Sequence, residues 1–188
     1  AGSGTTVVLF RTGFGGYPEY DDAGGSAPAA PSWPPDARWV QIASLPEGAA
    51  YEDDPRLRDF WDYAAFAQDG CGAVSLPAMT TGTLDYHLGD VSDGVTRCEG
   101  NGRVWTEDLS LLGSRYGATL APGDPYGCLD VGPTTDGSAD ARPASDNALD
   151  FEDLMMFTTN FNQVSGPQYS PALAERDELT LVAPPQVA

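Results

Sequence analysis

Two segments of the chain repeat the same pattern of acidic and apolar residues. RVWTEDLSLLGSRYG, residues 103–117, aligns without a gap with ALDFEDLMMFTTNFN, residues 148–162. In each segment an acidic pair is followed by apolar residues at the spacing of one helix face. These apolar residues are Leu109, Leu112 and Tyr116 in the first segment and Leu154, Phe157 and Phe161 in the second. The repeat therefore predicts two short helices, over 106–117 and 151–162, each with a buried face and an acidic start.

The acidic helix starts can be explained in two ways. Carboxylates at such a position cap free backbone N–H groups and favour the positive end of the helix dipole. However, a further acidic stretch precedes each helix: GDVSDG at 89–94 and LDVGPTTDG at 129–137. A calcium loop of the EF-hand type takes ligands from loop positions 1, 3, 5, 7 and 9, and from a carboxylate at position 12 inside the following helix. The repeated spacing favours calcium loops over simple capping.

Counting backward from the second acidic residue of each pair as position 12 assigns the other ligands. Position 1 is then Asp90 in the first loop and Asp130 in the second, so the loops carry insertions containing 96–100 and much of 134–145. Such insertions are tolerable because the entropy of loop closure rises only slowly with length. For position 3, each loop offers two candidate ligands. The candidate ligands are Asp90, Ser92 or Asp93, Asn101, Arg103 (through its carbonyl) and Asp108 in the first loop, and Asp130, Thr134 or Asp136, Asp146, Ala148 (through its carbonyl), Asp150 and Asp153 in the second.

The stretch GDVSDG…NGRVWTEDLSLL resembles dockerins, the duplicated calcium-binding modules of extracellular bacterial assemblies. The resemblance covers about 89–162. It implies a calcium ion in each loop, hence two sites, a helix after each loop, and a role in holding proteins together outside the cell. The chain departs from the family at Asn147, where loop position 6 is usually Gly. Many dockerins carry a Ser-Thr pair that contacts their partner protein, a cohesin. At these positions the chain has Thr106-Glu107 and Phe151-Glu152, so we do not expect a conventional cohesin partner.

The first 87 residues favour a β module. Residues 5–12, 39–45, 60–68 and 73–86 are rich in β-branched and aromatic residues and are bounded by Gly, Pro and Asp, which predicts four strands. The segment between the first two is dense in Pro and Gly and predicts a long surface loop. FWDYAAFAQDGCGAVSLPAMT resembles the last two strands of a fibronectin type III sandwich, and VVLFRTGF resembles an earlier central strand. The resemblance implies a β-sandwich.

Four strands are too few for such a sandwich, which has about seven. The first strands are then missing, and an incomplete sheet exposes edge backbone groups and an apolar face. ELTLVAPPQVA, residues 178–188, predicts a terminal strand that pairs within its own chain or with the sheet of a neighbouring chain, which would propagate into a polymer. A fragment of a longer multidomain protein is the alternative. The expected organisation is an incomplete fibronectin III-like module at 1–87, a dockerin-like module at 88–163, and a linker with a C-terminal strand at 164–188.

Charge and composition narrow the partners and the location. The net charge is −19, with 28 Asp and Glu against 9 basic residues, all arginine, so nucleic acid and anionic lipid are not expected to bind. The sequence has no apolar run of the roughly 18 residues that a membrane span needs. Because it begins at Ala1 without Met or an apolar leader, we favour a secreted, extracellular protein with its signal peptide removed over a fragment.

Cysteine and histidine give little support to an enzyme. Cys71, Cys98 and Cys128 show no Cys-x-x-Cys spacing, so neither a zinc nor a redox motif is indicated. Their odd number leaves at least one thiol free or joined to another chain, and the sequence assigns no pair. A lone His87 makes a His-based triad or a three-His zinc site hard to build, and we expect it to be structural or on the surface.

The sequence thus predicts a mixed fold, with an incomplete fibronectin III-like β-sandwich module and a small α-helical dockerin-like module with two calcium loops. The expected function is that of a secreted, non-catalytic structural or assembly protein. Calcium would stabilise it, and it would contact other protein chains, with a filament built through the C-terminal strand as one form of self-association. The alternative is a dockerin-like adaptor module of a larger extracellular enzyme or cell-surface protein.

Overall fold

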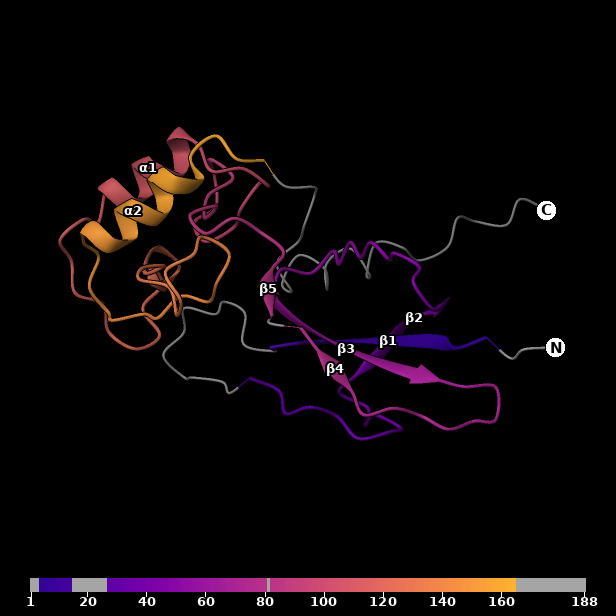
Figure 1. The fold of residues 1–188 in the computed structure, drawn as a ribbon. Coiled ribbons are helices and arrows are strands. Elements are labelled where there is room, and N and C mark those ends of the chain that lie inside the picture. Colours follow the sequence, from indigo (N-terminus) through magenta and orange to yellow (C-terminus); the bar gives the residue numbers. More distant parts are fainter. Residues whose placement is uncertain (1–3, 15–26, 81, 165–188) are drawn as a thin grey trace, which may run out of the picture.

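A computed structural model describes residues 4–14, 27–80 and 82–164 (Figure 1). It combines a small antiparallel sheet with two helices, so the fold is mixed as predicted. The elements are β1 (Thr6–Gly13), β2 (Val40–Pro46), β3 (Phe60–Gln68), β4 (Ala78–Met79), β5 (Thr83–Leu84), α1 (Thr106–Gly113), a short 3₁₀ helix (Gly127–Leu129) and α2 (Phe151–Asn160). Among the described residues, no helix is both long and apolar enough to cross a membrane.

The sheet has the strand order β2-β1-β3-β4, and β5 also pairs with β3. All of these pairings are antiparallel, and β1 lies between β2 and β3. Burial alternates along β1 and β3, so one face of the sheet is buried, where Val8 lies opposite Phe66 and Phe10 opposite Ala64. The three long strands confirm the predictions at 5–12, 39–45 and 60–68 to within one residue at each end.

A loop covers the buried face of this sheet. The ring of Trp33 packs edge-on against Phe10 and Phe66, with ring centres 6.0 and 5.2 Å apart. Pro28 and Pro31 of the same segment are buried. The described part of the Pro- and Gly-rich loop therefore has no regular element, as expected, but it supplies part of the core and is not only a surface feature. No second sheet is present among the described residues.

Two element predictions were too long. The strand predicted over 73–86 is wrong as one element, because the chain there forms only the two-residue strands β4 and β5. Pro77, which lacks an N–H group, and Gly82 are poor residues for an uninterrupted strand. The first helix ends at Gly113, and the Tyr116 side chain is exposed and does not belong to its buried face.

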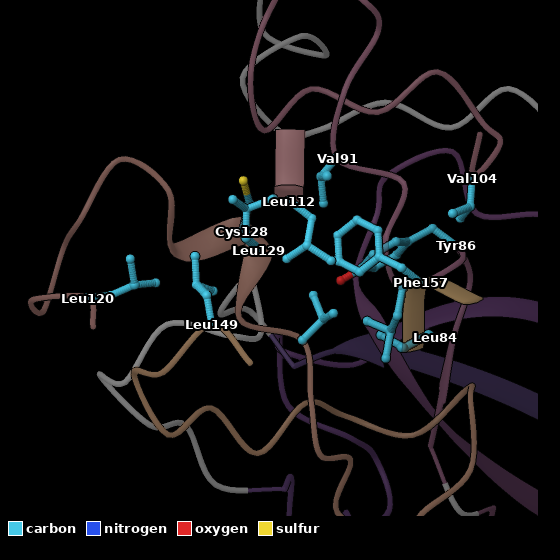
Figure 2. Packing of buried hydrophobic residues seen from close by; sticks show 12 residues of the cluster. Leu84, Tyr86, Val91, Val104, Leu112, Leu120, Cys128, Leu129, Leu149 and Phe157 are labelled. Carbon is cyan, nitrogen blue, oxygen red and sulfur yellow. The ribbon is translucent and has the colours of Figure 1, made fainter. Parts of the chain in front are cut away.

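The two helices pack side by side, apart from the sheet (Figure 1). Leu112 of α1 and Phe157 of α2 are essentially inaccessible to solvent. Figure 2 shows them gathered with side chains from the loops between the helices, among them Leu129 and Leu149. Leu84 and Tyr86, at the end of the sheet region, belong to the same cluster. The helical part and the end of the sheet thus share one core.

Candidate cation-binding loops

The acidic residue at the third position of α1 ties its loop to its helix. Oδ1 of Asp108 accepts hydrogen bonds from the backbone N–H groups of Val91 and Ser92, at 2.9 and 2.8 Å. Its Oδ2 accepts one from the N–H of Trp105 at 2.7 Å. Burial raises the pKa of Asp108 to about 6, although these hydrogen bonds act in the opposite direction.

The third residue of α2 repeats this arrangement. Oδ1 of Asp153 accepts hydrogen bonds from the N–H groups of Val131 and Gly132, at 2.8 and 2.9 Å, and Oδ2 accepts one from Asp150 at 2.9 Å. Burial likewise raises the pKa of Asp153. The duplication in the sequence is therefore also a duplication of tertiary contacts, and it places the predicted position 12 of each loop beside the predicted position 1.

The first aspartate of loop one is fully paired. Oδ1 and Oδ2 of Asp90 accept hydrogen bonds from the N–H groups of Asn101 and Gly102, each at 2.8 Å. Arg58 completes the set, because its Nη2 pairs with Oδ2 and its Nη1 donates to the backbone carbonyl of Asp90 at 2.8 Å. Both side chains are buried, with 1% and 0% of their surface exposed. Sequence reasoning missed Arg58, which lies 32 residues before its partner.

For the first aspartate of loop two, Asp130, the described residues supply no arginine partner of this kind. Asp130 is 2% exposed, and its Oδ2 accepts a hydrogen bond from the N–H of Asn147 at 2.8 Å. Its Oδ1 is buried and makes no hydrogen bond within the described residues. Burial is the main cause that raises the pKa of Asp130 to about 6. The charges of Asp153 and Asp146 raise this pKa further, whereas the N–H groups of Asn147 and Asp146 lower it.

The other predicted ligands of loop two accept hydrogen bonds from backbone groups close to them in the sequence. Asp146 is exposed, and its Oδ1 accepts from the N–H of Ala148 at 2.8 Å. Asp150 caps α2, because its Oδ1 accepts from the N–H of Glu152 at 3.0 Å. Asn147 has a φ of 65°. It thus adopts the left-handed backbone that glycine usually provides at loop position 6, as Gly102 does in the first loop.

Position 3 differs between the loops. Ser92 is buried, and its hydroxyl oxygen accepts from the N–H of Gly94 at 3.1 Å. The residue that makes the equivalent bond to the helix is Gly132 in loop two, which offers no side-chain ligand. A Cβ atom at residue 132 would lie only 2.7 Å from the backbone nitrogen of Asp153, so the loop and helix approach each other too closely for a larger residue.

The alternative position 3 candidates have local roles. Asp93 is exposed, and the N–H groups of Thr96 and Val95 donate to its Oδ1, which lowers its pKa. Asp136 is exposed and accepts from Ser138, which also lowers its pKa. The Thr134 hydroxyl is directed at the carbonyl of Ser138, at 2.6 Å. In loop one, the side chain of Arg103 forms an exposed ion pair with Glu107 at 3.5 Å, and only its carbonyl was expected to bind a cation.

A disulfide joins the two loops. Cys98, in the insertion of the first loop, is bonded to Cys128, which lies just before Asp130. Cys71 is exposed and free. The spacing of the cysteines does not indicate this pairing, because the contact depends on how the insertion folds. His87, the lone histidine, lines a hollow of about 350 Å³ together with Asp85 and Asp140.

The two loops differ in whether they can accept a cation. Within residues 4–14, 27–80 and 82–164, no three His, Cys, Asp or Glu side chains converge as a metal site. A cation would therefore rely partly on backbone carbonyls and water. In loop two the unpaired Oδ1 of Asp130 and the nearby charge of Asp146 fit a hard cation, whereas in loop one Arg58 already neutralises Asp90. Comparisons with protein-family models, curated proteins and solved structures give no match.

Proposed function

We propose that this chain is a secreted, non-catalytic structural or assembly protein that calcium stabilises through the second loop and that contacts other protein chains. The observation that carries the calcium part is the buried Oδ1 of Asp130, which has no hydrogen-bond partner in the described structure. A buried carboxylate oxygen without a partner is destabilising, and a bound cation would remove that cost.

Calcium suits a loop of this composition. It prefers six to eight oxygen ligands, from carboxylates, backbone carbonyls and water, in a flexible geometry. Asp130 and Asp146 would supply carboxylates, Ala148 would supply its carbonyl oxygen, and water would supply the other ligands, including one between the ion and Asp150. The cation would contribute charge compensation for a cluster of like charges. The Cys98–Cys128 disulfide supports secretion, because such bonds persist mainly in oxidising compartments.

Thermal unfolding with and without calcium tests this proposal. Calcium at about 100 times its dissociation constant adds about 2.7 kcal/mol to the free energy of unfolding, which raises Tm by roughly 5–10 °C for a chain of this size. The measurement is calorimetry in excess calcium and in chelator, with magnesium as the control for nonspecific charge screening. An unchanged Tm on calcium removal would refute the calcium part of the proposal.

The sheet supports an assembly role. On the fibronectin III-like interpretation, β3 and β4 would be the last two strands of the sandwich and β1 an earlier central strand, and these three strands are neighbours in the sheet. In the described structure β2 is an edge strand that pairs only with β1, and Val40 at its start is 59% exposed. Such an edge can accept another strand. We propose that ELTLVAPPQVA, which lies outside the described residues, pairs with the sheet of a neighbouring chain.

Deletion of residues 179–188 tests strand exchange. The full chain is expected to form assemblies that are visible by electron microscopy and light scattering, and the deleted chain is expected to remain monomeric. Substituting Pro for Ser44 in β2 is expected to have the same effect. The N–H of Glu47 donates to Thr5 beside β1, and backbone groups alternate in direction along a strand, so the N–H of Ser44 belongs to the free edge. Assemblies that persist after the deletion, or a full chain that is always monomeric, would contradict strand exchange.

The adaptor alternative has one observation in its favour. Phe151 and Met155 lie one helical turn apart on α2 and are 62% and 44% exposed. Exposed apolar side chains on one helix face are typical of protein contacts. An adaptor would not self-assemble, so monomeric behaviour of both the full and the deleted chain would favour this function over an assembly protein.

A further inference from the structure

The two duplicated loops differ in what meets their first aspartate. In the second loop, Oδ1 of Asp130 is buried without a partner. In the first loop, the equivalent Asp90 is held by the guanidinium of Arg58, and both side chains are almost fully buried. In an EF-hand-type loop the carboxylate at position 1 binds the cation. In the first loop the guanidinium of Arg58 lies beside that carboxylate.

The surroundings of Arg58 are shaped to hold a guanidinium. One nitrogen donates to the backbone carbonyl of Asp90 at 2.8 Å, and the other pairs with the carboxylate. The guanidinium carbon lies 5.1 Å from the centre of the Tyr86 ring, at the distance of a cation–π contact. Gly100 leaves the necessary space, because a Cβ atom there would overlap the guanidinium.

We propose that Arg58 takes the place of the cation in the first loop, so that the chain binds a single divalent cation, in the second loop. The binding of a cation by the second loop rests on the proposed function, whereas the role of Arg58 in the first loop does not. Arg58 carries a permanent positive charge that neutralises Asp90, and a calcium ion beside it would be repelled in a poorly solvated site. The resemblance to dockerins implies two cations, and the first loop does not fit that expectation.

This assignment links the sheet to the first loop. Arg58 lies in the segment between β2 and β3, so the sheet part of the chain supplies the charge that closes a loop of the helical part. The first loop is then held closed by the fold itself and is insensitive to chelators. The second loop alone responds to calcium.

The intact protein provides the first test. Calorimetric titration with calcium is expected to give one ion per chain, and the amide resonances that shift are expected to lie in 130–153 and not in 90–108. Two ions, or shifts of residues 90–108, would overturn the inference while leaving calcium binding intact. If no ion binds, the calcium part of the proposed function is refuted. The role of Arg58 is then tested by the melting measurements in chelator.

Melting in chelator isolates the role of Arg58. Arg58→Ala is expected to lower Tm by roughly 10 °C, because it leaves Asp90 buried without its cation. Arg56→Ala, two residues earlier and exposed, is the matched control and should leave Tm unchanged. Equal melting of the two variants would overturn the inference.

A second variant covers the case in which Arg58→Ala does not fold. Gly100 is not in the left-handed region, so Gly100→Ala adds only a methyl group against the guanidinium. The expected result is a lower Tm, together with a shifted Asp90 carboxylate resonance that shows the ion pair is disturbed. An unchanged Tm and resonance would show that the guanidinium is not fixed in the loop.

Discussion

Asp90 and Asp130 are the same residue at the same place in a repeated loop, yet their environments differ. Each is buried and accepts backbone hydrogen bonds, but only the first also meets a guanidinium. Burial raises the pKa of Asp130, and the charges of Asp153 and Asp146 add to this rise. The arginine beside Asp90 therefore gives two repeated aspartates different electrostatic environments.

Asp130→Asn should abolish the stabilisation by calcium. The amide removes the negative charge that attracts the ion, but its oxygen can still accept the hydrogen bond from Asn147. The expected result is a Tm that does not respond to calcium and is no lower in chelator than that of the parent protein. Asp140→Asn, at an exposed position in the insertion of the same loop, is the control. A variant at residue 130 that kept the full response would place the calcium site elsewhere.

The raised pKa of Asp85 contributes to the pH dependence of the free energy of unfolding. Burial raises the pKa of Asp85 from 3.8 to about 6, although the N–H of Asp59 and the charge of Arg58 act in the opposite direction. Between these two pH values the folded protein binds more protons than the unfolded chain, so the free energy of unfolding falls as the pH rises. Above pH 6 this cost is fully present.

Asp85→Asn should remove this cost. At pH 7 we expect the variant to be more stable than the parent by roughly 1–2 kcal/mol, with a difference that vanishes toward pH 4. Urea unfolding in chelator over this pH range is the measurement, and the exposed Asp54→Asn is the control. A difference that does not depend on pH would show that Asp85 keeps an ordinary pKa in the folded protein.

At the scale of elements, the disulfide between the loops is the clearest support for the helical part. Cys98 and Cys128 are separated by 30 residues, so the bond shortens a long loop in the unfolded chain. On the loop-entropy estimate this contributes about 3.5 kcal/mol to stability. Replacing both cysteines by serine should lower the free energy of unfolding by an amount of this order.

The free thiol supplies the control for that experiment. Cys71 is exposed and lies in the turn after β3, so Cys71→Ser should leave the unfolding curve unchanged. Calorimetry of the two variants and of the reduced parent protein makes the comparison. Equal stability of the double variant and the parent would mean that the helical core alone holds the two loops together.

The strands and helices that could be predicted are those whose positions are determined by the residues within them and at their ends. β1 and β3 are rich in β-branched and aromatic residues and are bounded by Gly, Pro and Asp, and these boundaries confine a strand to one place. The segment from 73 to 86 is also rich in strand-forming residues, but Pro77 and Gly82 divide it. Each helix start was predicted to the residue because the acidic pair marks it, whereas the first helix end was not.

The candidate site was predictable only in part. The spacing of Asp108 and Asp153 placed them correctly beside the openings of their loops, because a local repeat determines that relation. Arg58 could not be identified, since its contact with Asp90 depends on how the sheet and the loop pack together. Nor does spacing show that Gly132 leaves position 3 of the second loop without a side chain.

At the scale of the whole molecule, charge and packing oppose each other. A net charge of −19 makes the chain repel itself when it is compact, and the core shared by the helices and the end of the sheet must overcome this repulsion. Screening by salt weakens the repulsion, so roughly 0.5 M KCl should raise the Tm of the calcium-free protein. Differential scanning calorimetry against KCl concentration checks this, and a Tm that falls with added salt would contradict it.

The position of Arg58 also has a consequence for the order of events during synthesis. A ribosome adds Arg58 to the chain 32 residues before Asp90, so the guanidinium exists before the first loop does. This loop can close as soon as it is made, with a partner already carried by the chain. If the second loop binds calcium as proposed, it can be completed only after an ion arrives from outside the chain.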